Sequence, residues 1–179
     1  MKILYLHGFG GHYSPRKKKV QALSQLGEVS GYDIDWTRPA EELIDEGENH
    51  LGDLVDLVVG ISMGGWLAAT LANIYEIPFV AINPMIDPQG SSLLKTLLPA
   101  EIIDGYSDFP KDGAGLILLD EGDKSINSFT TFDTMQEYYD CRLFPEGSHR
   151  FEHIEESIPC IQSFVDLTEF TWGRDNDND

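Results

Sequence analysis

The segment that most constrains the fold lies at residues 57–69, where an apolar run meets a glycine-flanked serine and then a second apolar run. Residues 57–59 are Leu-Val-Val, which is typical of a buried strand, whereas residues 65–72 are rich in Ala and Leu, which is typical of a helix. Between the two runs stands Gly60-Ile61-Ser62-Met63-Gly64. This order predicts a strand that turns sharply into a helix, with Ser62 at the turn.

A turn of this kind places unusual demands on its residues. The backbone of Ser62 is expected to be strained, and glycines two positions away on either side leave room for it. The Ser62 hydroxyl then stands above the edge of the sheet, and the Met63 N–H at the start of the helix points toward any negative charge that forms beside it. Because the pattern is short and its residues are common, two interpretations stay open at this point: a nucleophilic serine or an ordinary strand–helix turn.

Apolar strands alternate with helical patterns along the rest of the chain. Strands are predicted at residues 3–7, 29–34, 54–59, 78–83, 116–119 and 141–144. Helices are predicted at 15–26 (with Ser14 as N-cap and Pro15 at the first position), 39–49, 63–75, 128–139 and from about 151 onward. This alternation predicts an α/β fold: a mostly parallel sheet of about six strands with helices on both faces, of the compact α/β-hydrolase type with a minimal lid.

The length of 179 residues predicts a single domain, at residues 1–170. Residues 84–114 break the strand–helix rhythm with four prolines and one short amphipathic piece at 91–98. Such an insertion after a strand is either a lid or substrate wall, or a structural crossover. Residues 171–179 are expected to form a flexible acidic tail.

The chain is strongly acidic: 31 Asp and Glu residues against 12 Lys and Arg residues give a formal net charge of −19. This charge argues against nucleic acid and anionic lipid as partners, because both would be repelled. The basic residues are also unevenly distributed, since residues 16–19 are Arg-Lys-Lys-Lys. They either border a binding site or form a solvated helix face.

Cysteine usage and hydropathy predict a cytoplasmic protein. Cys141 and Cys160 show no metal or redox spacing and are expected to be reduced packing thiols. The first apolar run is too short for a signal peptide, and no run approaches a membrane span. No cofactor and no metal is expected, and the oligomeric state is taken to be monomer or homodimer.

A serine nucleophile needs a base, which in this fold comes from the loop after the last strand. Only His149 of the five histidines lies in such a loop, after a flexible Gly147-Ser148 pair. A helix-capping or solvated loop residue is the alternative for His149. His149 and His153 could also be two metal ligands, but no third ligand is placed beside them.

The acid that orients this base is expected after the preceding strand, at residues 120–123. Asp123 is favoured because Gly122 holds it out on the loop, from where its carboxylate can reach a histidine on the neighbouring strand. Asp120, at the very end of the strand, remains the alternative, and Glu121 is a weaker one. The resulting order of Ser62, Asp123 and His149 is the order expected for an α/β-hydrolase.

A second donor to a negatively charged oxygen is expected from the glycine-rich loop after the first strand. Its glycines allow close backbone approach, and the N–H of Phe9 is the favoured donor, with Gly10 second. An ordinary flexible turn is the alternative interpretation. Gly8 and Gly10, together with Arg16 and Lys17 of the basic run, are the candidate substrate-binding residues.

These segments resemble the α/β-hydrolase superfamily and, within it, the small bacterial YqiA-type esterases. The resemblance covers residues 3 to about 167 and is carried by five short segments: Tyr5-Leu6-His7-Gly8-Phe9, Gly60-Ile61-Ser62-Met63-Gly64-Gly65, Ile82-Asn83-Pro84, Gly122-Asp123 and Gly147-Ser148-His149-x-Phe151. The chain departs from the family pattern in residues 84–114 and in its acidic tail, which leaves substrate size and acyl chain length open.

The resemblance implies a hydrolase of carboxylic esters or thioesters, including acyl-CoA-like substrates. Ser62 would be the nucleophile, His149 the base and Asp123 the orienting acid, with the N–H groups of Phe9 and Met63 holding the oxyanion. Two alternatives of other classes stay open: a non-catalytic binding or regulatory protein on a hydrolase scaffold, and a serine peptidase or amidase.

Overall fold

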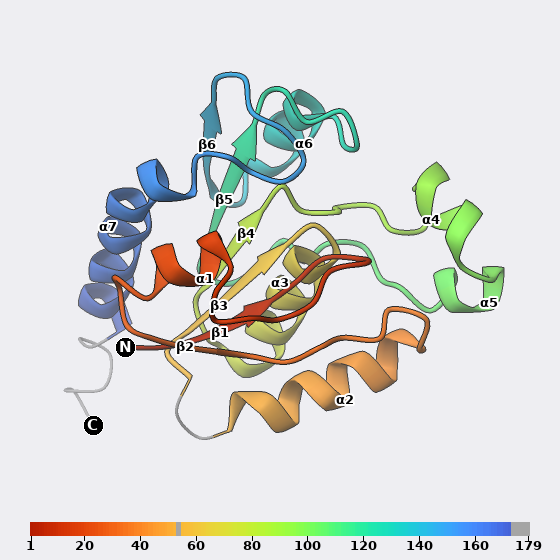
Figure 1. The fold of residues 1–179 in the computed structure, drawn as a ribbon, viewed down its shortest axis with the longest axis horizontal. Helices are drawn as coiled ribbons and strands as arrows, with labels where there is room; N and C mark the ends of the chain where they lie inside the picture. Colours follow the sequence, from red (N-terminus) through yellow and green to blue (C-terminus); the bar gives the residue numbers. More distant parts are fainter. Residues whose placement is uncertain (53–54, 173–179) are drawn as a thin grey trace.

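The computed structural model describes residues 1–52 and 55–172 as a single sheet with helices packed around it (Figure 1). In chain order the elements are β1 (Lys2–Leu6), α1 (Lys18–Leu23), β2 (Glu28–Gly31), α2 (Ala40–Leu51), β3 (Leu57–Ile61), α3 (Met63–Tyr75), β4 (Phe79–Ile82), α4 (Ser92–Leu97), α5 (Ala100–Ile103), β5 (Gly115–Asp120), α6 (Ser128–Met135), β6 (Asp140–Phe144) and α7 (Ile154–Trp172).

The six strands form one parallel sheet in the order β2-β1-β3-β4-β5-β6. The predicted fold class, an α/β sheet of about six strands, is confirmed. The strand order reverses at β1, because β2 lies on one side of it and β3 on the other. In open parallel sheets the crevice at such a reversal, beyond the carboxyl ends of the strands, is the usual place for a ligand.

The helices divide between the two faces of the sheet, and each face has its own apolar core. On one face α1 and α7 cover the sheet with residues such as Val20, Leu23 and Ile161, all buried. On the other face α2, α3 and α6 supply Leu43, Trp66 and Met135. Because both faces are covered, the central strands are apolar at nearly every position, as a parallel sheet requires.

The first helix is shorter than predicted, since α1 begins at Lys18 rather than at residue 15. Ser14 does not cap it: the Ser14 carbonyl accepts the Lys17 N–H at 3.1 Å and closes a separate turn. Lys17, the actual N-cap, has an extended backbone (φ −70°, ψ 138°). Tyr13, the residue before Ser14, donates its N–H to the Asp33 carboxylate (2.6 Å). This part of the chain is therefore held beside the segment after β2 and does not join the helix.

The second strand is also shorter than predicted, because β2 ends at Gly31 instead of residue 34. The Ile34 N–H does not pair with a neighbouring strand but donates to Nε2 of His7 at 2.8 Å. A side chain at the end of β1 therefore replaces the strand pairing that the apolar pattern had suggested.

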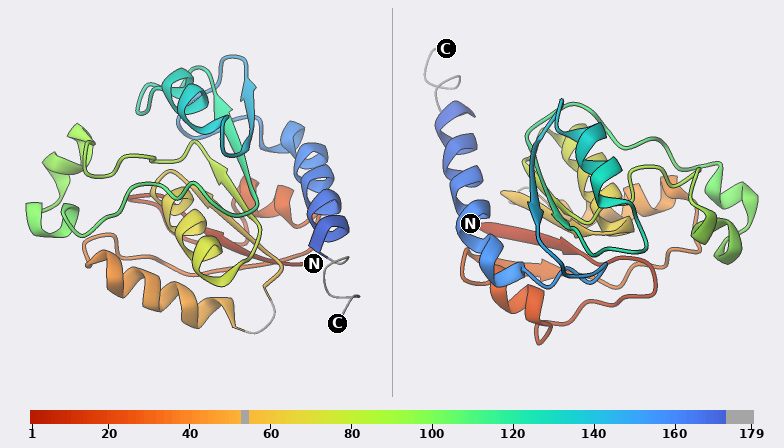
Figure 2. Two further views of the ribbon diagram at one scale, coloured as in Figure 1. Left: turned by 180° about the vertical axis from the view of Figure 1, so that it is seen from behind. Right: turned by 90° about the horizontal axis from the view of Figure 1, so that it is seen from above.

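Residues 84–114 form α4, α5 and the segments around them, at the end of the molecule opposite α7 (Figures 1 and 2). They are anchored on α3: the Trp66 indole N–H donates to the carbonyl of Ser107 (3.0 Å), and the Trp66 ring packs edge-on against Tyr106. Leu94, Ile103 and Phe109 are buried in the same core. This segment is therefore tied into the fold at several points.

Two further expectations concern the end of the chain and the membrane. Helix α7 extends to Trp172, and the remaining acidic tail at 173–179 lies outside the described residues. Among the helices that the structure describes, none combines the length and the apolar character needed to cross a membrane.

Candidate active site

Ser62 occupies the turn between β3 and α3 with the strained backbone that the sequence predicts. Its φ is 57° and its ψ −121°, in a region that residues other than glycine rarely adopt. The surrounding hydrogen bonds hold this conformation: the Ser62 N–H donates to the carbonyl of Ile82 (3.0 Å), and its carbonyl accepts the N–H groups of Gly65 and Met85 (2.9 and 3.1 Å). Ser62 is thus held by β4, by the segment that follows β4 and by α3.

The two glycines that flank Ser62 are needed for space. A Cβ atom on Gly60 would overlap the carbonyl oxygen of Gly64, and one on Gly64 would overlap the carbonyl oxygen of Leu6. Neither glycine has a positive φ. The start of α3 therefore lies directly against the ends of β1 and β3, which only residues without a side chain permit.

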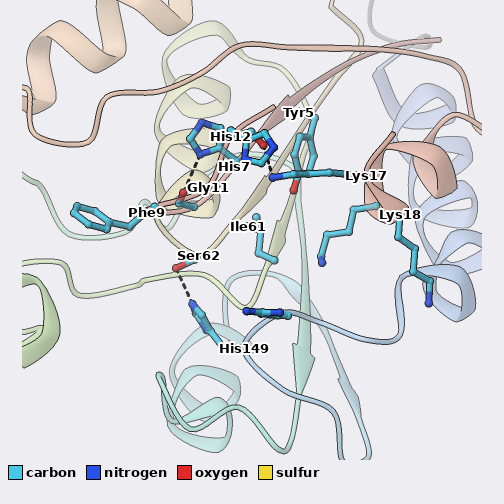
Figure 3. A pocket seen from close by; sticks show the side chains of 14 residues that line it. Tyr5, His7, Phe9, Gly11, His12, Lys17, Lys18, Ile61, Ser62 and His149 are labelled. Carbon is cyan, nitrogen blue, oxygen red and sulfur yellow. Dashed lines mark hydrogen bonds between the residues drawn. The ribbon is translucent and has the colours of Figure 1, made fainter. Parts of the chain in front are cut away.

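His149 lies between Ser62 and Asp123 and contacts both (Figure 3 shows the contact to Ser62). Its Nε2 is 2.9 Å from Oγ of Ser62, and its Nδ1 is 2.6 Å from Oδ2 of Asp123. A carboxylate can only accept, so the proton of the neutral ring resides on Nδ1. Nε2 then presents its lone pair to the Ser62 hydroxyl, which is the arrangement that a general base requires.

Asp123, rather than Asp120, faces His149. Its other oxygen, Oδ1, accepts the N–H groups of Ser125 (2.7 Å) and Ile126 (3.1 Å), so the carboxylate is held from two sides. Asp123 is 7% exposed. Of the two aspartates that the sequence left as alternatives, the structure brings only Asp123 to the histidine.

Asp120 binds the loop that carries His149. Its Oδ2 accepts the N–H groups of Ser148 (3.1 Å) and Glu152 (2.8 Å), and its Oδ1 accepts Nδ1–H of His153 (2.7 Å). The carboxylate is fully buried. Because it fixes the backbone on both sides of His149, Asp120 positions that residue without touching it.

Asn83 is a second positioning residue, which the sequence marks only as part of the family resemblance and not as a site residue. It is fully buried with φ 41°, and its amide nitrogen donates to the carbonyls of Ser148 (3.0 Å) and His149 (3.4 Å). Its amide oxygen accepts the N–H of Asp120 (2.9 Å). A polar residue directly after the apolar strand β4 was the available signal.

The loop after β1 lies against Ser62. A Cβ atom on Gly8 would stand 2.9 Å from Cβ of Ser62 and 3.5 Å from its Oγ, so the loop backbone approaches the hydroxyl closely. Within residues 1–52 and 55–172, neither the Phe9 N–H nor the Met63 N–H donates a hydrogen bond. These two N–H groups are therefore free to donate, and the loop that carries Phe9 lies beside the Ser62 hydroxyl.

His7 holds this loop in place. Its Nε2 accepts the N–H of Ile34, so the ring proton is on Nδ1, which donates to the carbonyl of Gly8 at 2.8 Å. Burial lowers the pKa of His7 below its ordinary value, which keeps the ring neutral. A neutral His7 therefore connects the segment after β2 to the loop beside Ser62.

A cavity of about 550 Å³ opens beside Ser62 and His149, at the reversal of strand order next to β1 (Figure 3). Of the predicted substrate-binding residues, Gly8, Gly10 and Lys17 line it, whereas Arg16 does not. Lys18 and Lys19, the rest of the predicted basic run, also line it, as do His12 and Arg150, which the prediction left out.

The comparison of sequences assigns the chain to a family. Residues 2–101, more than half of the chain, match the model of the uncharacterised protein family UPF0227. The chain belongs to UPF0227. A UPF0227 protein of Shewanella woodyi is 25% identical over 175 residues, with 90% of this chain and 98% of the relative covered. A UPF0227 protein of Yersinia enterocolitica is 25% identical over 178 residues, with 92% and 99% covered.

Solved structures at low sequence identity share the fold of this UPF0227 chain, and one of them is an α/β-hydrolase domain-containing protein. Mouse alpha/beta hydrolase domain-containing protein 10 superposes with a TM-score of 0.67 at 16% identity, covering 93% of this chain and 90% of that one. Est1E from Butyrivibrio proteoclasticus gives 0.69 at 16% identity, covering 95% and 88%. A monoacylglycerol lipase from Paleococcus ferrophilus gives 0.68 at 16% identity, covering 92% and 94%.

Proposed function

We propose that this UPF0227 chain is a serine hydrolase that cleaves carboxylic esters or thioesters, acyl-CoA-like ones among them, through an acyl-enzyme on Ser62. The observation that carries the proposal is the continuous hydrogen-bond chain from Asp123 through His149 to Ser62, in which each distance is 2.9 Å or shorter. The strained turn under Ser62 supports it, since such strain is concentrated at functional sites. Fold neighbours that include a monoacylglycerol lipase and lipolytic enzymes fit the same chemistry.

The first half of the reaction forms the acyl-enzyme. Nε2 of His149 takes the proton from Ser62 while Oγ attacks the acyl carbonyl carbon, and the carbonyl oxygen becomes an oxyanion. The N–H groups of Phe9 and Met63 are the proposed donors to that oxyanion. When the tetrahedral intermediate collapses, the bond to the alcohol or thiol breaks, and His149 gives its proton to the leaving oxygen or sulfur.

The second half regenerates the enzyme. Water enters the site and loses a proton to His149 while its oxygen attacks the Ser62 ester. Collapse of this second intermediate releases the carboxylic acid and returns the proton to Ser62. Throughout both halves Asp123 stays ionised and stabilises the positive charge that His149 carries after each proton transfer.

The proposal predicts that Ser62→Ala removes nearly all ester hydrolysis. We expect kcat/KM for a short p-nitrophenyl ester to fall by about 10³-fold or more, because the acyl-enzyme cannot form. Ser163→Ala is the matched control, since Ser163 is an exposed serine on α7, far along the chain from the site. A fluorophosphonate probe should label the wild-type protein and the control but not the Ser62→Ala variant.

Substantial turnover by the Ser62→Ala variant would refute the nucleophile. A wild-type protein that neither turns over esters nor takes up the probe would instead favour a binding or regulatory protein on a hydrolase scaffold. Faster cleavage of aminoacyl amides than of matched esters would favour the peptidase alternative. A series of esters and acyl-CoA thioesters of increasing chain length then determines the acyl group and the leaving group.

A further inference from the structure

The cavity beside Ser62 has a strongly basic wall. We use the term basic rim for its four cationic lining residues, which are Lys17, Lys18, Lys19 and Arg150. They come from two distant parts of the chain: the lysines from the start of α1, and the arginine from the loop that also carries His149. Figure 3 shows Lys17 and Lys18 on the opposite side of the view from Phe9, with Ser62 and His149 below.

The composition of this wall is opposite to that of the whole chain. The protein has 31 acidic and 12 basic residues, yet its 14 cavity-lining residues include four of the 12 bases and no acid. A solvated helix face would account for the three lysines alone. It does not account for Arg150, which reaches the same cavity from the other end of the sequence.

The cationic groups of the basic rim are not neutralised by the protein. In the part of the chain that the structure describes, none of the four side chains forms an ion pair. Lys17 donates to the carbonyl of His12 at 2.6 Å, which leaves further N–H donors on its ammonium group. The charge of the buried Asp120 carboxylate acts on Lys19, but this carboxylate already accepts from two backbone N–H groups and from His153.

Lys19 is a partly buried member of the basic rim. Burial is the largest cause that lowers its pKa; the charge of Asp120 raises it, and the neighbouring charges of Lys17, Lys18 and Arg150 lower it. Like charges gathered in a partly desolvated wall are unfavourable for the free protein. A bound anion reduces that repulsion, and this reduction favours anion binding.

We infer that the substrates of this site carry an anionic group of the phosphate or carboxylate class, which the basic rim binds while Ser62 attacks the acyl carbonyl. The inference rests on the proposed function, because it assigns a substrate class to the same site. Ammonium and guanidinium groups bind phosphate and carboxylate oxygens through charge-assisted hydrogen bonds. In an otherwise acidic molecule, they also give an anionic substrate one attractive entrance.

The test compares Lys18→Gln/Arg150→Gln with Lys95→Gln/Lys111→Gln. Both double variants remove two positive charges, but Lys95 lies on α4 and Lys111 precedes β5, away from the lining of the cavity. Three acyl esters are used that differ only in bearing a neutral, a carboxylate or a phosphate group. We expect the ratio of kcat/KM for the anionic esters to that for the neutral ester to fall about 10-fold in the rim variant and less than about 2-fold in the control variant.

An equilibrium measurement makes the test independent of turnover. Inorganic phosphate and acetate are titrated into the wild-type protein and both variants by calorimetry, at low and at physiological salt. We expect phosphate to bind the wild type and the control variant and to bind the rim variant several-fold more weakly. The difference in affinity between phosphate and acetate, taken with the two kcat/KM ratios for the anionic esters, identifies which anion the rim prefers.

The outcomes separate this inference from the proposed function. An unchanged ratio in the rim variant, or an equal fall in both variants, overturns the basic rim as a binding site, even when Ser62 still reacts with a fluorophosphonate. Anion binding that the rim variant weakens, in a protein whose Ser62 does not react, would support the rim and refute the hydrolase proposal.

Discussion

Asp120 is the last residue of β5, Asp123 lies three residues further along in the following loop, and the two face different histidines. Asp123 contacts His149, which contacts Ser62, whereas Asp120 contacts His153 and the backbone around His149. At the residue scale, one carboxylate therefore contacts the proposed base and the other fixes the loop that carries it. Replacing each aspartate by asparagine should therefore have a different effect.

Asp123→Asn and Asp120→Asn should separate catalysis from stability. For Asp123→Asn we expect kcat on an ester to fall by roughly 10²–10⁴-fold, because an amide no longer stabilises a charged His149. For Asp120→Asn we expect unfolding free energy to fall by about 1–3 kcal/mol, because an N–H₂ group replaces one of the accepting oxygens. Urea denaturation and ester kinetics on both variants provide the measurements, and a larger kcat loss in a stably folded Asp120→Asn protein would reverse the assignment.

His7 makes a prediction about pH. Burial lowers its pKa in the folded protein, so below about pH 6.5 the unfolded chain binds the proton more readily. The stability that neutral His7 contributes is complete above that pH and is lost as the pH falls. The loss amounts to at most ~1.4 kcal/mol per pH unit.

Urea denaturation between pH 5 and 8 tests this for wild type, His7→Gln and the exposed control His50→Gln. We expect the stability difference between wild type and His7→Gln to shrink as the pH falls from 7 to 5, because glutamine does not titrate. The difference between wild type and His50→Gln should change less. A wild-type advantage over His7→Gln that stays constant or grows at low pH would contradict a neutral, buried His7.

At the scale of elements, the contact of α3 with β1 and β3 is what places Ser62. Helix α3 runs from Met63 to Tyr75, as the sequence predicts, and starts one residue after the serine. The close approach depends on Gly60 and Gly64, whose missing side chains leave room for backbone carbonyls. Local sequence and tertiary contact agree here, which explains why this element was predicted correctly.

Two glycine substitutions distinguish close approach from backbone strain. Gly64→Ala inserts a methyl group into the carbonyl oxygen of Leu6, so we expect a loss of about 3 kcal/mol or more of unfolding free energy. Gly10→Ala meets no atom within 4 Å but must adopt a φ of 68°, so we expect a loss of only about 1–2 kcal/mol. Thermal or urea unfolding measures both, and equal losses would show that space at the turn is not the limiting factor.

The elements that sequence reasoning misplaced are those whose ends depend on distant residues. The start of α1 is delayed to Lys18 because Ser14 closes a turn of its own and Tyr13 is bound to Asp33. The end of β2 comes early because Ile34 donates to His7. Neither partner is visible to a pattern read over a short window of sequence.

At the scale of the whole molecule, the sheet gathers residues from five separate loops at one edge. The loops after β1, β3, β4, β5 and β6 supply Gly8, Ser62, Asn83, Asp123 and His149 respectively. Parallel strands end on the same side, so functional groups that are distant in sequence meet there. The same edge carries the basic rim, which gives an acidic molecule a local region of opposite charge.

By itself the sequence determined the α/β class, the strained turn at Ser62 and the histidine loop, because hydrophobic periodicity and glycine spacing are local properties. Only the tertiary structure decided between Asp123 and Asp120, identified Asn83 and His7 as positioning residues, and brought Arg150 rather than Arg16 to the cavity. Those decisions depend on which side chain reaches across from a neighbouring strand. Which side chain reaches across depends on the register and packing of the sheet, and these cannot be read from the residues of one strand alone.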